Sequence, residues 1–312
     1  MPRDSERTAP RQGFGLITPL QADVLKTIGR TTGHSAQLCR CESVGGGCIN
    51  ESQKYVLEDG RLFFVKSNHP EFLVMFEQEL SGLRALEIPK VLRVPKPVAH
   101  GLSTNGHHSF LILEWIESGH PRPSSSEEFG VGLATLHQQT TAAEFGFHAD
   151  NFIGSTPQPN TWHTQWIDFW RQCRLGYQLQ LAQKHGYADS EFHRLGNRVL
   201  DATESIIGQP EEPPTLIHGD LWSGNYLYDQ SGNAVLVDPA AYYGRREAEL
   251  AMTRLFGGFD SCFYEAYEEV WPLETGATER IAFYQLYHVL NHLNLFGPSY
   301  RSQCLTLLKR FA

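Results

Sequence analysis

Three side chains in the last third of the chain could together serve phosphoryl transfer: Asp220, Asn225 and Asp238. Transfer from ATP uses a carboxylate beside the attacking hydroxyl, and an amide oxygen and a second carboxylate that bind magnesium. Such oxygen ligands suit Mg²⁺. A lone His-Gly-Asp run usually marks a turn, but this set at these spacings favours a kinase-type site with Asp220 as the base. His218 is predicted to hold the loop through hydrogen bonds rather than to transfer protons.

A lysine in the first part of the chain could bind the nucleotide phosphates. Lys66 ends an apolar strand predicted at 61–66, from which its cation can reach the α- and β-phosphates. Such a lysine needs an anion to fix it. We choose Glu79, in the middle of the next predicted helix, with Glu77 as the second choice. The alternative is a solvated lysine at a strand end.

Glycines and a cysteine lie between two predicted strands: Gly45, Gly46, Gly47 and Cys48. Glycines allow backbone N–H groups to approach phosphates, so this run is predicted to be a phosphate-binding loop. It is not a Walker A motif, because the Gly-Lys-Ser/Thr ending is absent. Cys48 is expected to be a small packing residue, with a redox-sensitive thiol as the alternative.

Composition narrows the class of protein. The chain of 312 residues is long enough for one large domain or two lobes. Its hydrophobic residues, 41% of the total, are enough for a sizeable core. A formal charge of −9 argues against a nucleic-acid-binding surface. The polar N-terminus lacks the apolar core of a secretory signal, and no apolar run is long enough to cross a bilayer. The six cysteines form no C-x-x-C pair, which favours free thiols in a reducing cytoplasm.

The first 113 residues show the pattern of a small antiparallel sheet with one main helix. Strands are predicted at 39–44, 52–57, 61–66, 91–97 and 109–113, the main helix at 71–86 and a short helix at 18–27. An Asp-Gly pair at 59–60 marks a hairpin. Residues 1–12 are predicted to be a loose tail. This part would be the ATP-binding lobe.

Residues 114–122 are polar and rich in Gly and Pro, as in a linker, and residues 123–312 are mainly helical. Ser125 and Glu128 form a capping-box signature for a helix that runs to 139. Further helices are predicted at 162–186 and 192–208, from 246 and from 279, with a hairpin turn at 231–233. The chain is therefore predicted to have an α+β, protein-kinase-like bilobal fold.

His288 and His292 lie four residues apart on a predicted helix and could bind a metal on one face. No acidic or thiol partner is evident in the sequence. A structural role in the core is therefore the preferred interpretation.

Three long motifs closely resemble the fructosamine kinase family, the ketosamine-3-kinase branch of the aminoglycoside/choline kinase-like superfamily. They occupy 150–160, 218–225 and 238–247, and shorter similar runs lie at 169–171, 174–179, 255–258 and 286–292. The resemblance covers about residues 40–300. The first 30 residues match little.

The resemblance implies ATP- and Mg²⁺-dependent phosphorylation of the 3-hydroxyl of a ketosamine, a sugar adduct on a small amine or on a protein lysine. The unstable product releases the amine, so the activity is deglycation. By matching position, Asp220 is the catalytic base, and Asn225 and Asp238 bind magnesium. Lys66 and Glu79 clamp ATP. The backbone from Glu114 to Ile116 holds the adenine.

The resemblance also points to residues that contact the substrate. Trp222 lies beside the base, where it packs on the sugar or is a core aromatic. Asp150, Asn151 and Gln158 belong to the motif that favours a ketosamine, and they are candidate substrate contacts. The family's phosphate-loop cysteine is matched by Cys48. The protein is therefore expected to be a monomer or a redox-dependent homodimer linked by a disulfide.

Other functions remain open at this point. Asp238 is followed by Pro-Ala, and no Ala-Pro-Glu signature is evident, which indicates a small-molecule kinase without a phosphorylated activation loop. The nearest rival is a phosphotransferase of the aminoglycoside, choline or homoserine kinase type. A non-catalytic nucleotide-binding redox sensor is less favoured, because Lys66, Glu79, Asp220, Asn225 and Asp238 are all present.

Overall fold

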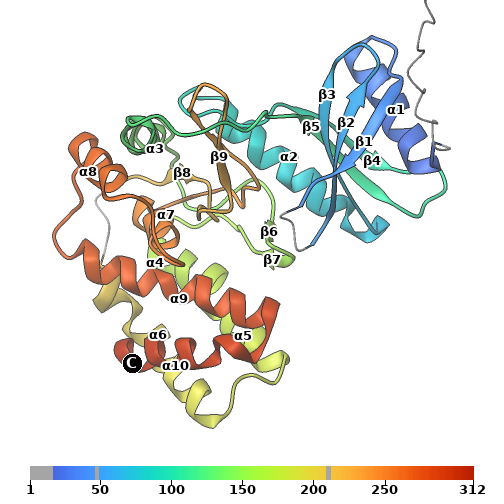
Figure 1. The fold of residues 1–312 in the computed structure, drawn as a ribbon. Coiled ribbons are helices and arrows are strands. Elements are labelled where there is room, and N and C mark those ends of the chain that lie inside the picture. The colour runs from blue at the N-terminus through green and yellow to red at the C-terminus, as the bar shows by residue number, and fades with distance from the viewer. Residues whose placement is uncertain (1–16, 46–48, 209–211) are drawn as a thin grey trace, which may run out of the picture.

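The computed structural model describes residues 17–45, 49–208 and 212–312 (Figure 1). A five-stranded antiparallel sheet lies at one end of the molecule, and helices form the other end. The sheet order is β1 (Leu38–Ser43), β2 (Glu51–Leu57), β3 (Leu62–Asn68), β5 (Ser109–Glu114) and β4 (Pro97–Leu102). The predicted α+β architecture, a small antiparallel sheet with one main helix followed by a larger helical part, is confirmed.

Both faces of the sheet are covered. On β5, Phe110 and Ile112 pack with helix α1 (Pro19–Thr32), whereas Leu111 and Leu113 belong to the large core that includes helix α2 (Leu73–Glu87). Successive side chains of a strand point to opposite faces. By the same alternation on β3, Lys66 lies on the face opposite to Phe63 and Val65, which pack with α1.

Helix α1 is longer than the predicted 18–27. Thr18 and Gln21 form a reciprocal capping box at its start, and Gly33 ends it in a left-handed conformation with φ 74°. Ile28 is fully buried and extends the apolar stripe past the predicted end, so packing on the sheet continues the helix.

The strand predicted at 91–97 is wrong. Pro95 lacks the N–H group that a sheet ladder needs, and β4 begins only at Pro97. The segment before it runs instead beside the C-terminal part of the chain, where Arg93 forms a single parallel bridge with Val235. The segment thereby joins the two ends of the molecule. The main helix, predicted at 71–86, is confirmed as the 3₁₀ turn η1 (Pro70–Phe72) followed by α2.

The C-terminal part packs its helices around one core. These elements are α3 (Ser125–Gln139), α4 (Trp166–Phe169), the π-helix η2 (Trp170–Gly176), α5 (Tyr177–Lys184), α6 (Ser190–Ile207), α7 (Arg246–Thr253), α8 (Ser261–Val270), α9 (Ala277–Phe296), the 3₁₀ turn η3 (Pro298–Tyr300) and α10 (Arg301–Phe311). Helix α6 ends at Gly208, as predicted. No helix among the described residues is both long and apolar enough to span a membrane.

Two details of the helical prediction are wrong. The capping box does not form, because Ser125 already lies inside α3, and its hydroxyl bonds instead to Gly232 O across the chain. The helix predicted from 162 begins at Trp166, and Trp162 is 40% exposed outside it.

Short strand pairs bring the predicted catalytic residues together. They are β6 (Asn151–Ile153) with β7 (Thr156–Gln158), β8 (Thr215–Ile217) with β11 (Tyr242–Gly244), and β9 (Tyr226–Tyr228) with β10 (Ala234–Leu236). The loop 218–225 follows β8, and the loop 237–241 precedes β11, so these pairings hold the two loops side by side. The hairpin turn at 231–233 is confirmed.

Candidate active site

The carboxylate of Asp220 is held by the amide of Asn225. Asn225 Nδ2 donates to Asp220 Oδ2 at 3.0 Å and to the Asp220 carbonyl at 2.8 Å. Burial raises the pKa of Asp220 well above its usual value, and the hydrogen bond from Asn225 opposes that shift only in part. An oriented carboxylate with a raised pKa is suited to accept a proton from an alcohol.

A buried carboxylate that the sequence interpretation missed holds the backbone of this loop. Glu249 on α7 accepts hydrogen bonds from the N–H groups of His218 and Gly219. Its side chain is completely buried. The sequence offers no signal for this contact, since a glutamate in a helix is ordinarily solvated.

His218 holds the loop in place, as predicted. Its Nε2 donates to Val237 O at 2.8 Å, and its Nδ1 accepts from Asp220 N at 3.3 Å. Burial lowers the pKa of His218, so the ring is neutral, as this donor and acceptor pattern requires. The histidine therefore ties the catalytic loop to the strand end that precedes Asp238.

Lys66 joins the sheet to the second loop. Its Nζ lies 2.8 Å from Glu79 Oε1 and 2.5 Å from Asp238 Oδ1. Burial alone would lower the pKa of Lys66, but the nearby carboxylates of Asp238 and Glu79 outweigh burial and raise it. The lysine therefore stays cationic. Glu77, the second choice as partner, is exposed on α2.

Helix α2 fixes Glu79 by packing on the loop that carries Asp238. A Cβ atom on Gly82 would lie 3.2 Å from Pro239 Cγ, so only glycine allows this approach without adjustment. Ser81 Oγ also lies 2.9 Å from His148 Nε2, on the C-terminal part of the chain. These contacts set the distance between Glu79 and the catalytic loops.

The oxygens of Asn225 and Asp238 fit a magnesium ion. Asn225 uses its amide nitrogen on Asp220, and within the described residues its Oδ1 has no hydrogen bond. Asp238 uses Oδ1 on Lys66 and is about half exposed, which leaves Oδ2 available. The N–H of Val237 donates to the Asn225 carbonyl at 3.0 Å and keeps the two residues adjacent. Carboxylate and amide oxygens are suitable Mg²⁺ ligands.

The predicted phosphate loop is described only in part. Gly45 is exposed at the end of β1, whereas Gly46, Gly47 and Cys48 lie outside the described residues. Asn68, at the end of β3, donates to the Ile49 carbonyl at 2.9 Å and to Asn50 Oδ1 at 2.8 Å. Asn68, which the sequence interpretation missed, thus ties the end of the loop to the strand that carries Lys66.

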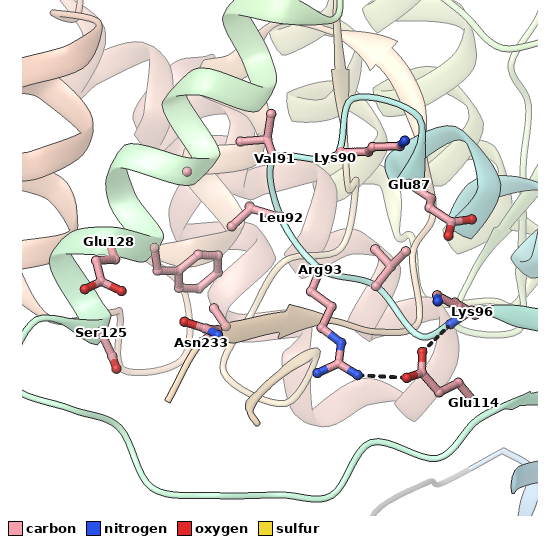
Figure 2. A pocket seen from close by; sticks show the side chains of 14 residues that line it. Glu87, Lys90, Val91, Leu92, Arg93, Lys96, Glu114, Ser125, Glu128 and Asn233 are labelled. Atoms are coloured by element: carbon pink, nitrogen blue, oxygen red, sulfur yellow. Dashed lines mark hydrogen bonds and ion pairs between the residues drawn. The ribbon is translucent and has the colours of Figure 1, made fainter. Parts of the chain in front are cut away.

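The predicted adenine-binding segment begins at the end of β5. The Glu114 N–H donates to the Lys96 carbonyl at 2.9 Å. Its carboxylate binds Arg93 at 2.8 Å and accepts from the Lys96 N–H at 3.1 Å (Figure 2). The backbone N–H and the carboxylate of Glu114 are therefore both used in contacts with the 93–96 segment. Ile116 is buried. The backbone beyond Glu114 remains the better candidate for contact with adenine.

A cavity of about 650 Å³ lies beside this segment, lined by the 87–96 connection, α3 and the β9–β10 hairpin (Figure 2). Lys66, Asp220 and Asp238 do not line it. Arg93 lines the cavity and forms ion pairs with Glu114 and with Asp229, at 2.8 Å each. The cavity lies where the sheet-bearing part of the chain meets the helical part, and it is separate from the phosphoryl-transfer residues.

The candidate substrate residues occupy different environments. Trp222, two residues after Asp220 in the chain, is 37% exposed, which rules out a core aromatic. Asp150 is exposed, with its carboxylate bound to the N–H of Asn160 at 2.7 Å. Asn151 and Gln158 are almost fully buried and hydrogen-bonded to backbone carbonyls, so their surroundings favour a role inside the protein over substrate contact.

The His288 and His292 pair has the surroundings of core residues. Burial lowers the pKa of His288 to about 3, and His292 Nδ1 donates to the His288 carbonyl at 2.8 Å. The described part of the chain contains no cluster of three metal-binding His, Cys, Asp or Glu side chains. The pair gives no support for a second metal site.

A strand lysine paired with a helix glutamate, facing loops that carry an aspartate base and an Asn and Asp suited to a metal, is the arrangement of protein-kinase-like phosphotransferases. The fructosamine kinase family model matches residues 20–312. The chain belongs to the fructosamine kinase family and is an ATP-dependent kinase, so the predicted family and enzyme class are confirmed.

Relatives and solved structures agree with this assignment. A probable ketoamine kinase of Synechocystis is 43% identical, with 92% of this chain and 95% of the relative covered. The chloroplastic protein-ribulosamine 3-kinase of Arabidopsis thaliana is 41% identical, with 96% and 91% covered. A crystal structure assigned as a fructosamine-3-kinase of Haemophilus somnus has a TM-score of 0.84 at 30% identity, with 92% and 96% covered. An aminoglycoside phosphotransferase, at 16% identity, TM-score 0.61 and coverage of 93% and 99%, shares the fold alone.

Proposed function

We propose that this protein transfers the γ-phosphoryl group of ATP to the 3-hydroxyl of a ketosamine, and that release of the amine then completes deglycation. The observation that carries the proposal is the connected set Lys66–Asp238 and Asn225–Asp220, joined by contacts of 2.5 to 3.0 Å. The ribulosamine and ketoamine kinases among its relatives support this acceptor over an aminoglycoside or choline.

Asp220 would accept the proton of the sugar hydroxyl as that oxygen attacks phosphorus. Asn225 orients the carboxylate with Nδ2 and keeps Oδ1 for the metal. Lys66, fixed by Glu79, would bind the α- and β-phosphates. Magnesium, when bound by Asn225 and Asp238, neutralises phosphate charge and orients the transferred group.

Trp222 would provide the acceptor surface, since its indole is exposed next to the base. A Cβ atom on Gly224 would lie 2.4 Å from the indole ring, so the glycine allows the ring to lie against the loop. A flat aromatic surface suits the apolar face of a sugar. The acceptor is a small ketosamine or a glycated lysine of a protein that reaches this surface.

Phosphate-loop binding by Gly45, Gly46, Gly47 and Cys48 and adenine contact near Glu114 and Ile116 are part of the same proposal. So is the division into an ATP-binding lobe at 1–113, a linker at 114–122 and a helical lobe at 123–312. The end of β5 at Glu114 and the start of α3 at Ser125 support that division. The protein is a monomer or a homodimer linked through Cys48. Size-exclusion chromatography with and without reductant distinguishes the two states.

The test is ATP consumption with Mg²⁺ on ribulosyl-lysine, fructosyl-lysine, an aminoglycoside and choline. Asp220→Asn is the inactive variant, and Asp201→Asn, at an exposed aspartate on α6, is the matched control. Turnover on a ketosamine that is lost only in Asp220→Asn supports the proposal. Turnover on the aminoglycoside or choline alone overturns the acceptor, and turnover near wild type in Asp220→Asn overturns the role of that residue.

A further inference from the structure

A chain of hydrogen-bonded buried side chains lies behind the metal loop and includes two of the residues first considered as substrate contacts. It consists of Arg174, Asn160, Asn151, Gln158 and Tyr287. None of the five is more than 4% exposed. They come from η2, the β6–β7 hairpin, the segment just after it at Asn160, and α9. Because these side chains are buried, a substrate in solution cannot contact them directly, and another role is needed to explain the network.

The network ends on two backbone carbonyls next to Asp238. Gln158 Nε2 donates to Ala240 O at 3.0 Å, and Asn151 Nδ2 donates to Ala241 O at 2.8 Å. Ala240 N in turn donates to the His218 carbonyl at 2.9 Å. The network thus holds the segment that follows Asp238 and, through it, the catalytic loop.

Asp238 needs such support because its backbone lies in the left-handed region, with φ 56°. A residue other than glycine persists there only when its surroundings enforce the conformation. On the N-terminal side, Val237 is held by its hydrogen bonds to Asn225 and His218. On the C-terminal side, the carbonyls of Ala240 and Ala241 are held by Gln158 and Asn151.

Each amide of the network is oriented by a neighbour with fixed donor or acceptor character. Arg174 can only donate, and its Nη2 donates to Asn160 Oδ1 at 2.8 Å. Asn160 Nδ2 must then face Asn151 Oδ1, also at 2.8 Å, and this directs the Asn151 nitrogen to Ala241 O. At the other end, Asn151 Oδ1 and the Ala240 carbonyl can only accept, so Nε2 of Gln158 faces them at 2.7 and 3.0 Å. Oε1 of Gln158 then accepts from the Tyr287 hydroxyl at 2.6 Å.

Arg174 has no carboxylate partner within the described residues: its Nη1 donates to the carbonyls of Pro159 at 2.6 Å and Cys173 at 2.9 Å, and its Nη2 donates to Asn160. Its guanidinium lies 3.9 Å from the ring centroid of Tyr242 and 4.5 Å from that of Phe169. Aromatic faces stabilise a buried cation. Because no acid competes for its donors, the guanidinium is free to fix Asn160.

We propose that Gln158 and Asn151 are positioning residues, which hold Asp238 in its metal-binding conformation through the Ala240 and Ala241 carbonyls. Arg174, through Asn160, sets the orientation of Asn151, and the Tyr287 hydroxyl holds the side chain of Gln158. The inference rests on the proposed metal role of Asp238. It assigns the buried residues of the 150–160 motif, Asn151, Gln158 and Asn160, to the metal loop and not to the sugar. Loss of Gln158 or Tyr287 function should therefore weaken metal binding and turnover while the ketosamine KM stays unchanged.

The experiment measures Mn²⁺ affinity with AMP-PNP by electron paramagnetic resonance, which needs no acceptor, together with rates against Mg²⁺ and ketosamine concentration. Gln158→Glu replaces the donating amide by an acceptor. Loss of an outer partner of a metal ligand typically weakens metal affinity by about tenfold or more. We expect that loss in Gln158→Glu, a smaller loss in Tyr287→Phe, and an unchanged ketosamine KM in both.

Tyr284→Phe is the matched control, because Tyr284 lies on the same helix, is equally buried and bonds through its hydroxyl to Trp166 Nε1 at 2.9 Å, outside the network. Its Mn²⁺ affinity should be that of the wild type. If Gln158→Glu does not fold, the two tyrosine variants decide. Wild-type Mn²⁺ affinity in Tyr287→Phe, an equal loss in Tyr284→Phe, or a raised ketosamine KM as the main effect overturns the inference.

Asp238→Asn separates this inference from the function on which it rests. A large loss of Mn²⁺ affinity in that variant supports the metal role itself. Wild-type affinity there overturns the metal role and the inference together. A protein that binds Mn²⁺ as expected but phosphorylates no ketosamine overturns only the acceptor.

Discussion

Lys66 Nζ lies 2.5 Å from Asp238 Oδ1, and this contact joins the sheet to the catalytic loops of the helical part. Both residues are proposed to bind the nucleotide, one through its phosphates and the other through magnesium. Glu79 holds the opposite side of the lysine at 2.8 Å. The position of α2, which carries Glu79, is therefore coupled to the metal loop.

Replacing Lys66 by methionine should remove activity and stability together. The substitution leaves the carboxylate of Glu79 buried without its partner, which costs about 3 kcal/mol in free energy of unfolding. Urea denaturation measures the stability, and initial rates of ATP consumption measure the activity. The double variant Lys66→Met/Glu79→Met should recover much of the stability and none of the activity. Recovery of activity would contradict the role of the lysine at the phosphates.

The raised pKa of Asp220 predicts a pH dependence of the rate. Below its folded-state pKa the carboxylate is protonated and cannot accept the hydroxyl proton, so kcat/KM should fall on acidification at a pH above the range of an ordinary aspartate. Asp220→Asn should lower kcat by about 100-fold or more and abolish this limb. If the residual activity of the variant still falls on acidification at the same pH, the titrating group is a residue other than Asp220.

The same pKa predicts a gain in stability for Asp220→Asn at neutral pH. The folded state binds the proton more tightly than the unfolded state, so the contribution of Asp220 to the free energy of unfolding falls as pH rises from the ordinary aspartate pKa to the raised one. The variant lacks this loss and should unfold at a higher urea concentration at pH 7. The difference should shrink in acid. Asp201→Asn, at an exposed site, should change neither value.

Gly219 should tolerate no side chain. Its φ is 83°, and a Cβ atom would lie 2.1 Å from Ala240 O, which is backbone and cannot move aside. Gly219→Ala should therefore separate the two loops and eliminate turnover. Gly186→Ala is the matched control, with φ 77° and no atom within 4 Å, and it should cost only about 1 kcal/mol of backbone strain with activity retained. Full activity in Gly219→Ala would refute the loop contact.

Glu249→Gln should impair the catalytic loop. One carboxylate oxygen becomes an NH₂ group that cannot accept a hydrogen bond, so the N–H groups of His218 and Gly219 are left with a single acceptor oxygen between them. An unsatisfied buried donor costs about 2 kcal/mol. We expect lower kcat and a lower melting temperature, measured by initial rates and calorimetry. Glu265→Gln, at an exposed position on α8, should change neither.

Trp222→Ala should weaken the acceptor and not the nucleotide. Loss of about 1.4 kcal/mol of contact would raise the KM for the ketosamine about tenfold and leave the KM for ATP unchanged. Trp162→Ala serves as the control, because Trp162 is similarly exposed, at 40%, but lies outside the catalytic loop. A change in ATP binding alone would contradict contact with the sugar.

The sequence alone determined the class of chemistry and most of the elements. Asp220, Asn225 and Asp238 are close in the chain, so their spacing already limits how they can be arranged. The helix at 71–86 and the hairpin at 231–233 follow from local periodicity and turn residues, which act over a few neighbours. The strand predicted at 91–97 is wrong because Pro95 interrupts it and because Arg93 pairs with Val235, which lies far away in the sequence.

Only the tertiary structure decided which of the acidic and amide side chains are functional and how. Glu79 and not Glu77 reaches Lys66, because the packing of Gly82 on Pro239 sets the rotation of α2. Glu249, Gln158 and Asn151 hold the loops through hydrogen bonds to backbone groups, which carry no side-chain signature in the sequence. Long-range contacts of this kind depend on the whole fold, so periodicity and motif spacing could not predict them.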